Sequence, residues 1–280
     1  MIEVRRLAWA GLEVQAGGAT AVIDLVEDFS FHHGDLPPEG EVPPSPPEDT
    51  VALGLLTHLH SDHADISALA RALRDDGVVL RPDRMTGSPA ETALVQRPES
   101  ALDESGMTTR VVDPWQTIEV GPFSVTALPA ADGFGDPQVS WSVAAEGCRI
   151  LHAGDTLFHG WWWLAALRHA PFDAAFLPVG GAVVDLPARQ PPSPLPAGMD
   201  PAQAAVAAKL LGAREVIPIH YGPLHAADNY VQADDQPARC ARPHATSASP
   251  RVCCGRARDS ESNPPEAARC TSPTRSTNRE

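Results

Sequence analysis

The chain has 280 residues, of which 43% are hydrophobic and 20% charged, so it is long enough to build one large domain around a sizeable core. Its formal net charge of -15 argues against a nucleic-acid partner, because phosphate binding depends on a basic surface. No apolar run approaches the roughly eighteen residues that span a bilayer, and the first residues lack a secretory signal. These features predict a soluble, cytoplasmic, acidic protein.

Residues 1–236 and residues 237–280 differ in composition. The second segment carries eight arginines against four acidic residues, six prolines, ten serines and threonines, and no aromatic residue. Such a segment cannot bury enough apolar surface to offset the entropy of ordering, so we expect it to be disordered. It is either a flexible natural tail or the product of a changed reading frame near Gln236.

Strand-like and helix-like segments alternate along residues 1–236. In chain order, apolar runs predict strands at 19–25, 51–57, 117–120, 123–128, 139–144, 149–153, 174–179 and 215–219, with Gly17-Gly18 as a hairpin turn before them. Helices are predicted at 66–74, after a capping box at 88–91, from 161, and at 201–211, where a second capping box starts the helix and Gly212 ends it. The pattern is typical of an α+β protein with mixed sheets.

The strongest chemical signal is the run from Thr57 to Asp65, THLHSDHAD, which directly follows a predicted strand. Three imidazoles and two carboxylates within eight residues are costly to desolvate together unless a positive charge holds them. Neutral histidine and ionised aspartate are the nitrogen and oxygen donors that zinc, manganese and iron accept. The run therefore predicts a divalent metal site.

Two distant strand ends supply further candidate ligands. The apolar run before Gly154 breaks at that glycine and presents Asp155, and the run VIPI presents His220. A single Asp or His at a strand end is usually a cap or a surface residue. Beside the histidine run, both become candidate ligands.

The motifs H-x-H-x-D-H, G-D-T and I-P-I-H-Y-G together resemble those of metallo-β-lactamase-fold hydrolases. The longer strings LHAGDT and MDPAQAAVAAKLLGAREVIPIHYG are similar to the branch that contains ascorbate-phosphate lactonase-like and N-acyl-phosphatidylethanolamine phospholipase-like enzymes. The similarity covers roughly residues 1–235. It implies a four-layer αββα sandwich with two divalent metal ions at one edge of the two sheets, zinc first, with manganese or iron as alternatives.

The resemblance also implies a role for each candidate residue. His58 and His60 correspond to ligands of the first metal, and Asp62, His63 and His220 to ligands of the second. Asp155 corresponds to the carboxylate that bridges the two metals, and Asp65 to an outer carboxylate that orients a ligand imidazole. With Asp62, Asp155 would also orient the attacking hydroxide.

One ligand position departs from the family pattern. The family usually places a third histidine of the first site in a Pro-Ala-x-His context, whereas this sequence has Asp132 there, after Pro129-Ala130-Ala131. With three aspartates and a bridging hydroxide, two divalent ions would reach a net charge of zero instead of +1. Asp132 would then make the first site harder and favour manganese or iron. The alternative is that Asp132 is a turn residue and that the first metal is weak or absent.

The resemblance predicts a hydrolase in which a metal-bound hydroxide attacks a lactone, an ester or a phosphodiester. The negative body and the single lysine give no evident anion-binding patch, which favours substrates without a phosphate. Two alternatives remain open at this point. One is a mononuclear iron oxygenase on the same fold, since two histidines and one aspartate can hold one iron. The other is a non-catalytic product with a defective C-terminus.

Overall fold

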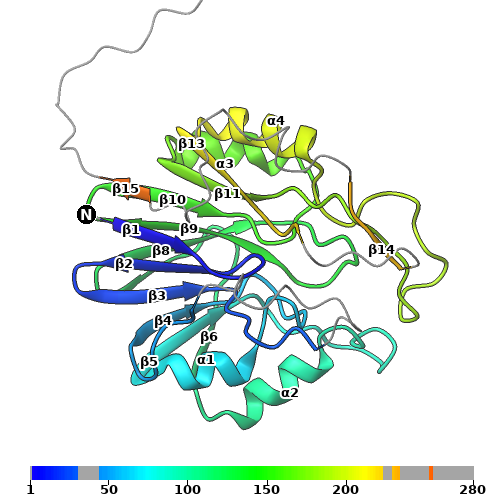
Figure 1. Cartoon of the computed structure of the whole chain (residues 1–280), viewed down its shortest axis with the longest axis horizontal. Helices are drawn as coiled ribbons and strands as arrows, with labels where there is room; N and C mark the ends of the chain where they lie inside the picture. The colour runs from blue at the N-terminus through cyan, green and yellow to red at the C-terminus, as the bar shows by residue number, and fades with distance from the viewer. Residues whose placement is uncertain (1, 31–43, 223–228, 234–251, 255–280) are drawn as a thin grey trace, which may run out of the picture.

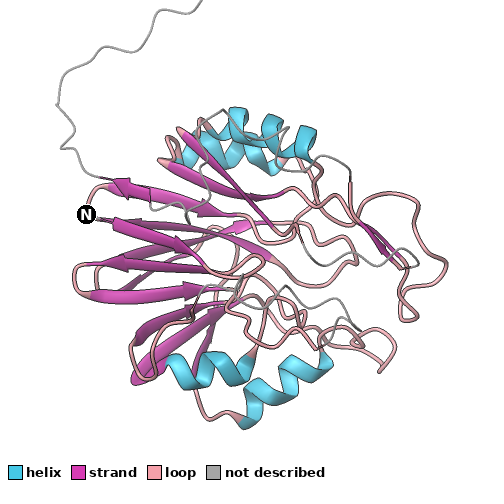
Figure 2. Ribbon diagram, viewed as in Figure 1, coloured by secondary structure: helices cyan, strands magenta, loops and turns pink. Residues whose placement is uncertain are grey.

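The computed structural model describes residues 2–30, 44–222, 229–233 and 252–254. Two mixed β-sheets pack face to face, and a pair of helices covers the outer face of each sheet (Figures 1 and 2). This arrangement confirms the α+β class and the αββα sandwich expected from the sequence.

The first sheet contains seven strands in the order β15-β1-β2-β3-β4-β5-β6. Their bounds are β1 Ile2–Arg6, β2 Leu12–Ala16, β3 Ala19–Ile23, β4 Val51–Leu55, β5 Leu73–Arg81, β6 Thr108–Val111 and β15 Val252–Cys254. The strands from β3 to β6 run parallel, and those from β15 to β3 run antiparallel. Strand β15 belongs to the segment that was expected to be disordered; the rest of that segment lies outside the described residues.

The second sheet contains six strands in the order β13-β11-β10-β9-β8-β7. Their bounds are β7 Thr117–Val120, β8 Phe123–Pro129, β9 Val139–Ala145, β10 Cys148–His152, β11 Ala174–Pro178 and β13 Glu215–Ile219. A two-stranded ribbon, β12 Val183–Val184 with β14 Tyr230–Val231, lies outside both sheets. All eight strands predicted from apolar runs are present, with ends that differ by at most two residues.

The helices are α1 Ile66–Ala72, α2 Gln96–Glu104, α3 Trp161–His169 and α4 Pro201–Leu211. The capping box that starts α4 forms as predicted, with the Asp200 carboxylate accepting from Gln203 N at 2.8 Å. Among the described residues, no helix is long and apolar enough to cross a bilayer.

The sequence predicted a helix directly after residue 88, and the structure has none there. Glu91 accepts from Ser88 N at 2.7 Å, so the capping box forms, but it closes a single turn and α2 begins only at Gln96. The residues of this turn are mostly exposed, and without an apolar face to bury, a short helix gains too little from its own hydrogen bonds to propagate.

Three hydrophobic clusters hold the four layers together. The largest lies between the sheets and joins residues of β1–β4 to residues of β8–β13, with Trp141 fully buried at its centre. A second lies between the first sheet and α1 and α2, and a third between the second sheet and α3 and α4. Burial on both faces is what fixes the two sheets relative to each other.

Backbone contacts bring the C-terminal ends of β4, β8 and β10 to one edge of the sandwich. Val139 N at the start of β9 donates to Thr57 O at 2.9 Å, and Trp141 Nε1 donates to Leu56 O at 3.1 Å, which ties the second sheet to the end of β4. A bridge between Asp132 and Thr156 ties the segment after β8 to the segment after β10. The predicted ligands follow these strand ends.

Gly154 fits the tightest place at this edge. Its φ is +67°, and a Cβ there would lie 2.7 Å from Gln138 Nε2 and 2.8 Å from Thr57 Oγ1. Gly147, in the turn between β9 and β10, has a similar φ of +79° but open space around it. The two glycines therefore share a backbone requirement, and only Gly154 also has a steric one.

We expect Gly147→Ala to lower the free energy of unfolding by about 1–2 kcal/mol, the cost of the left-handed backbone for alanine. Gly154→Ala should cost about 1–3 kcal/mol more, because the new methyl group must also displace Gln138 or Thr57. Urea unfolding of the two variants beside the wild type measures both losses. Equal losses of unfolding free energy in the two variants would show that the side chains around Gly154 move aside without cost, and would contradict the steric role.

Candidate metal centre

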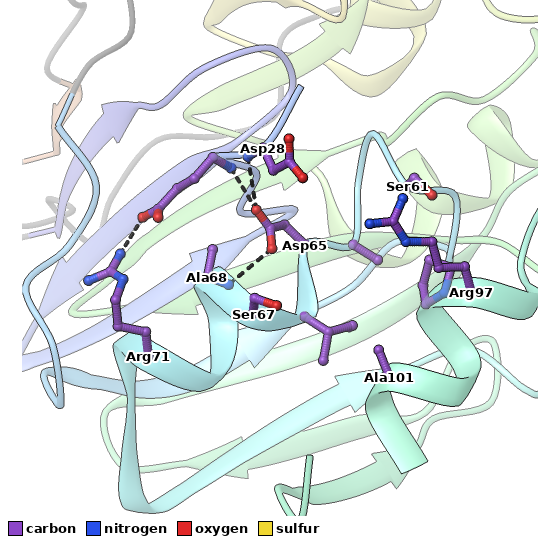
Figure 3. Close-up of a pocket in the computed structure, with 12 residues that line it drawn as sticks. Asp28, Ser61, Asp65, Ser67, Ala68, Arg71, Arg97 and Ala101 are labelled. Atoms are coloured by element: carbon purple, nitrogen blue, oxygen red, sulfur yellow. Dashed lines mark hydrogen bonds and ion pairs between the residues drawn. The ribbon is translucent and has the colours of Figure 1, made fainter. Parts of the chain in front are cut away.

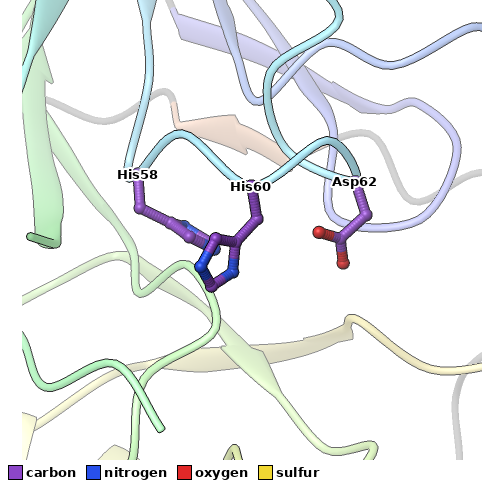
Figure 4. A group of neighbouring side chains, drawn as sticks. All are labelled: His58, His60 and Asp62. Atoms are coloured by element: carbon purple, nitrogen blue, oxygen red, sulfur yellow. The ribbon is translucent and has the colours of Figure 1, made fainter. Parts of the chain in front are cut away.

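All seven predicted metal ligands lie in one connected cluster at the edge of the two sheets. Their donor atoms form groups within 4.8 Å of one another, namely His58, His60 and Asp62; Asp62, His63 and His220; and His60, Asp132 and Asp136. Asp155 joins the cluster through His220, whose Nε2 lies 3.5 Å from Asp155 Oδ2. Figure 4 shows His58, His60 and Asp62 side by side on the loop after β4.

Hydrogen bonds fix which nitrogen of each first-site imidazole is free. The Thr57 hydroxyl donates to Asp24 at 2.6 Å, so its oxygen accepts from His58 Nδ1 at 3.0 Å and leaves Nε2 as the bare nitrogen. His60 Nε2 donates to Asp136 Oδ2 at 2.9 Å, which leaves Nδ1 bare. Both rings therefore turn a lone pair toward the cluster.

The two oxygens of Asp132 are compatible with both roles that the sequence left open. Its Oδ1 accepts from Phe134 N at 2.8 Å and from Asp136 N at 3.1 Å, as in a turn residue. Its Oδ2 is buried without a hydrogen-bond partner and lies 3.9 Å from the bare Nδ1 of His60. One oxygen holds the turn, and the other stays available to a metal ion.

The second-site residues are arranged in the same way. His63 Nδ1 donates to Asp24 Oδ2 at 2.8 Å, so Nε2 is bare, 3.7 Å from Asp62 Oδ2. His220 Nε2 lies 3.3 Å from the same Asp62 oxygen and 3.5 Å from Asp155 Oδ2. Donor atoms about 2.1 Å from a tetrahedral zinc ion are about 3.4 Å apart, so these spacings suit a shared cation.

Three buried atoms of the cluster have no hydrogen-bond partner: His58 Nε2, His63 Nε2 and Asp132 Oδ2. An unpaired buried polar atom costs about 1–3 kcal/mol, so three of them in one cluster require a group that satisfies them together. Nitrogen and carboxylate oxygen are donors for zinc, manganese or iron. The residues present therefore fit divalent metal ions.

The protonation of the cluster reflects its burial and its charges. Burial lowers the pKa of His58 well below its usual value. Burial acts in the same direction on His60 and His63, but the surrounding carboxylates together outweigh it. Asp132, Asp136 and Asp62 raise the pKa of His60, and Asp62 and Asp24 raise that of His63 to about 9. A raised pKa means that His60 and His63 hold a second proton more tightly. A metal ion must displace that proton before it binds the ring nitrogen, so metal affinity rises with pH.

The outer carboxylate beside a ligand imidazole is Asp24 and not the predicted Asp65. Asp24 is 1% exposed, follows β3, and accepts from His63 Nδ1, from the Thr57 hydroxyl and from Thr57 N. It thereby orients His63 directly and His58 through Thr57. The sequence offered little signal for it, since one aspartate after a strand is common.

Asp65 instead caps α1 and holds a neighbouring loop. Its carboxylate accepts from Ala68 N at 3.0 Å, and from Glu27 N and Asp28 N at 3.1 and 3.0 Å. Figure 3 shows these bonds in a pocket beside α1 and α2. The lining of this pocket includes Ser61 and Asp65 but none of the seven predicted metal ligands.

Trp9 is a second contact that the sequence did not indicate. Its indole Nε1 donates to Asp62 Oδ2 at 3.2 Å, and its ring lies 4.3 Å from the ring of His220. Trp9, Asp24 and His220 all have positive φ, between 47° and 58°. Left-handed backbone at residues other than glycine is uncommon and concentrates at functional sites, where the surrounding structure imposes it.

Further aromatic side chains lie near the cluster. His152 is fully buried and its Nε2 donates to Ala10 O at 2.7 Å, so it is a core histidine. Of the three tryptophans that begin α3, Trp162 is buried and Trp161 and Trp163 are exposed. His159 stacks on Trp162 at 4.1 Å, and burial lowers its pKa to about 4.

Comparison with known proteins agrees with this geometry. The family model of the beta-lactamase superfamily domain matches residues 21–221. The chain belongs to the beta-lactamase superfamily. A UPF0173 metal-dependent hydrolase of Rubrobacter xylanophilus is 30% identical over 64% of this chain and 69% of its own length. A second one, of Methanoculleus marisnigri, is 27% identical over 77% of this chain and 80% of its own.

Solved structures share the fold at lower identity. Igni18, a metallo hydrolase of Ignicoccus hospitalis, aligns with a TM-score of 0.54 and 18% identity over 80% of this chain and 86% of its own. CmlA, a diiron β-hydroxylase of Streptomyces venezuelae, aligns with a TM-score of 0.62 and 20% identity over 85% of this chain and 49% of its own. With the sequence relatives, these comparisons confirm a metal-dependent hydrolase of the metallo-β-lactamase fold.

We expect Asp24→Asn to weaken metal binding by about 10–100-fold. Asp24 accepts from Thr57 N at Oδ1 and from the Thr57 hydroxyl and His63 Nδ1 at Oδ2, and an amide has only one accepting oxygen, so one side of the network is lost and the imidazoles lose their orientation. Competition with a coloured zinc chelator measures the affinity. Asp65→Asn is the matched control, since asparagine caps a helix as well as aspartate does. Equal weakening in both variants would contradict the role of Asp24.

Proposed function

We propose that the protein is a binuclear metal-dependent hydrolase that adds water to a lactone, an ester or a phosphodiester. The observation that carries the proposal is the set of three bare, buried donor atoms, one in each of three overlapping groups of candidate ligands. When bound, two divalent ions lower the pKa of water toward neutrality and stabilise negative charge on the substrate oxygen. The cytoplasmic location inferred from the sequence is part of the same proposal.

The proposed ligand sets follow the family resemblance. His58 Nε2, His60 Nδ1 and Asp132 Oδ2 would hold the first ion, and His63 Nε2, His220 Nε2 and an Asp62 oxygen the second. The Asp62 donor atom lies within 4.8 Å of those of both histidine pairs. Asp155, whose Oδ2 lies 3.5 Å from His220 Nε2, would bridge the two ions. Asp62 and Asp155 would also orient the attacking water by accepting its protons.

The charges around the centre favour a substrate without a phosphate group. Two arginines lie close to it, and both already donate to protein groups: Arg6 to Tyr221 and to Trp9 O, and Arg189 to Asp136 and to several carbonyls. A phosphate would have to compete with those partners. A lactone or a carboxylic ester needs no such cation, so we place these first among the substrate classes.

A second candidate function is an iron-dependent oxygenase. Its support is the set His58, His60 and Asp62, whose donor atoms lie within 4.8 Å of one another and which provides two histidines and one carboxylate as in non-haem iron sites. The fold is also that of a diiron β-hydroxylase, although at 20% identity this likeness concerns the fold alone. Iron content and oxygen consumption in the purified protein distinguish this function from hydrolysis.

The hydrolase is tested by removing metal with a chelator, restoring zinc or manganese, and assaying a γ-lactone, a p-nitrophenyl ester and a p-nitrophenyl phosphodiester. We expect metal-dependent hydrolysis of the carbonyl substrates, and a loss of more than about 100-fold in His220→Ala, since even outer contacts cost 10–100-fold. His169→Ala, at the end of α3, is the control. Metal-loaded protein that hydrolyses none of the three classes would contradict the proposal.

Asp132→Asn tests whether the first site is complete. Asparagine keeps the oxygen that accepts from Phe134 N and Asp136 N, but it replaces the bare Oδ2 with an amide nitrogen that cannot bind a metal. We expect metal content to fall from about two ions per chain to about one. Asp113→Asn, at an exposed position, should leave it unchanged. Unchanged content in Asp132→Asn would show that Asp132 is only a turn residue.

A further inference from the structure

Arg189 lies behind the first group of ligands and makes an unusual number of contacts. Its Nη2 donates to both carboxylate oxygens of Asp136, at 3.2 and 3.3 Å. The same guanidinium donates to Phe134 O at 3.4 Å, to Ala90 O at 3.2 Å and to Glu91 O at 3.1 Å. Arg189 thus joins three segments distant in sequence, near residues 90, 135 and 189.

Asp136 connects this arginine to the metal centre. Its side chain is fully buried, and its Oδ2 accepts from His60 Nε2 at 2.9 Å. A buried carboxylate needs a compensating charge, and Arg189 supplies it from the side opposite His60. The chain of contacts runs from guanidinium to carboxylate to imidazole, and ends at the bare Nδ1 that faces Asp132.

The same carboxylate could also bind a metal ion itself. His60, Asp132 and Asp136 bring donor atoms within 4.8 Å of one another, so Asp136 is either an outer partner of His60 or a ligand that competes with it. Arg189 decides between these roles, because with the guanidinium on both oxygens Asp136 stays turned toward His60 Nε2. His60 then keeps the tautomer in which Nδ1 is free.

We propose that Arg189 is a positioning residue of the first metal site, which holds Asp136 against His60 and so keeps His60 Nδ1 available to the metal ion. The inference rests on the proposed function in one respect, that the first site binds a metal. It concerns that site alone: Asp24 orients one histidine of each site, whereas Asp136 contacts only His60 among the ligand histidines.

Metal affinity of the full-length protein tests the proposal. Zinc is titrated in competition with a coloured chelator into the wild type, Arg189→Gln, Asp136→Asn and the double variant. We expect each single change to lower the zinc affinity of the first site by about 10–100-fold, whichever site fills first in the titration, and to leave the affinity of the other site unchanged. The double variant should be no weaker than the weaker single variant, because both residues act through one chain of contacts.

Two further variants separate positioning from general stability. Arg214→Gln removes an arginine of the same charge from an exposed ion pair with Asp173, and should leave both affinities unchanged. Arg189→Lys keeps the positive charge but not the Nε and Nη1 groups that donate to Phe134 O and Ala90 O and fix the guanidinium beside Asp136, so we expect it to recover only part of the loss. It also provides a folded variant if Arg189→Gln does not fold.

The outcomes are distinguishable from failure of the proposed function. A wild type that binds one zinc ion or none contradicts the binuclear centre itself. A wild type that binds two, with Arg189 variants that bind both equally well, contradicts only the role of Arg189. Equal weakening of both ions, or losses that multiply in the double variant, would mean that Arg189 acts on general stability, and would overturn the proposal.

Discussion

The metal centre depends on the buried carboxylate of Asp24. It accepts from His63 Nδ1 and from the Thr57 hydroxyl, and Thr57 in turn accepts from His58 Nδ1. One aspartate thus sets the orientation and tautomer of one histidine in each predicted site. Because Asp24 follows β3 and Thr57 follows β4, the parallel pairing of these strands brings the network together.

The buried polar groups and the left-handed residues of this arrangement lower the stability of the fold. Carboxylates and imidazoles are buried at the sheet edge, and Trp9, Asp24 and His220 adopt left-handed backbone. Such groups are destabilising in isolation, and the apolar cores on both faces of each sheet offset them. A bound cation would remove the largest remaining penalty, since it pairs with the bare donor atoms of both sites.

The sequence predicts much of this structure because its motifs are local. The run from His58 to His63 and the apolar strands before Asp155 and His220 are continuous in the chain, so the candidate ligands and the strands that carry them could be predicted from pattern and resemblance. The capping box before α4 is equally local. The turn at Ser88 shows the limit, since a correct cap does not make a helix without an apolar face to bury.

The outer contacts could not be predicted in the same way. Asp24, Trp9, Asp136 and Arg189 are single residues in ordinary contexts, and their roles arise only when strands and loops distant in sequence meet. Asp65 illustrates the reverse case, since its place in the motif suggested an outer role, whereas the fold uses it to cap α1. For Asp132 the structure bears out the turn role through Oδ1, while the ligand role stays a prediction that the unpartnered Oδ2 permits.

The central claim is that two neighbouring groups of ligands hold two divalent ions. Elemental analysis of protein purified without chelator or affinity metal tests it most directly. The account predicts about two equivalents of zinc or manganese per chain. About one equivalent of iron would favour the oxygenase instead, and a folded sample with no metal would contradict the centre described above.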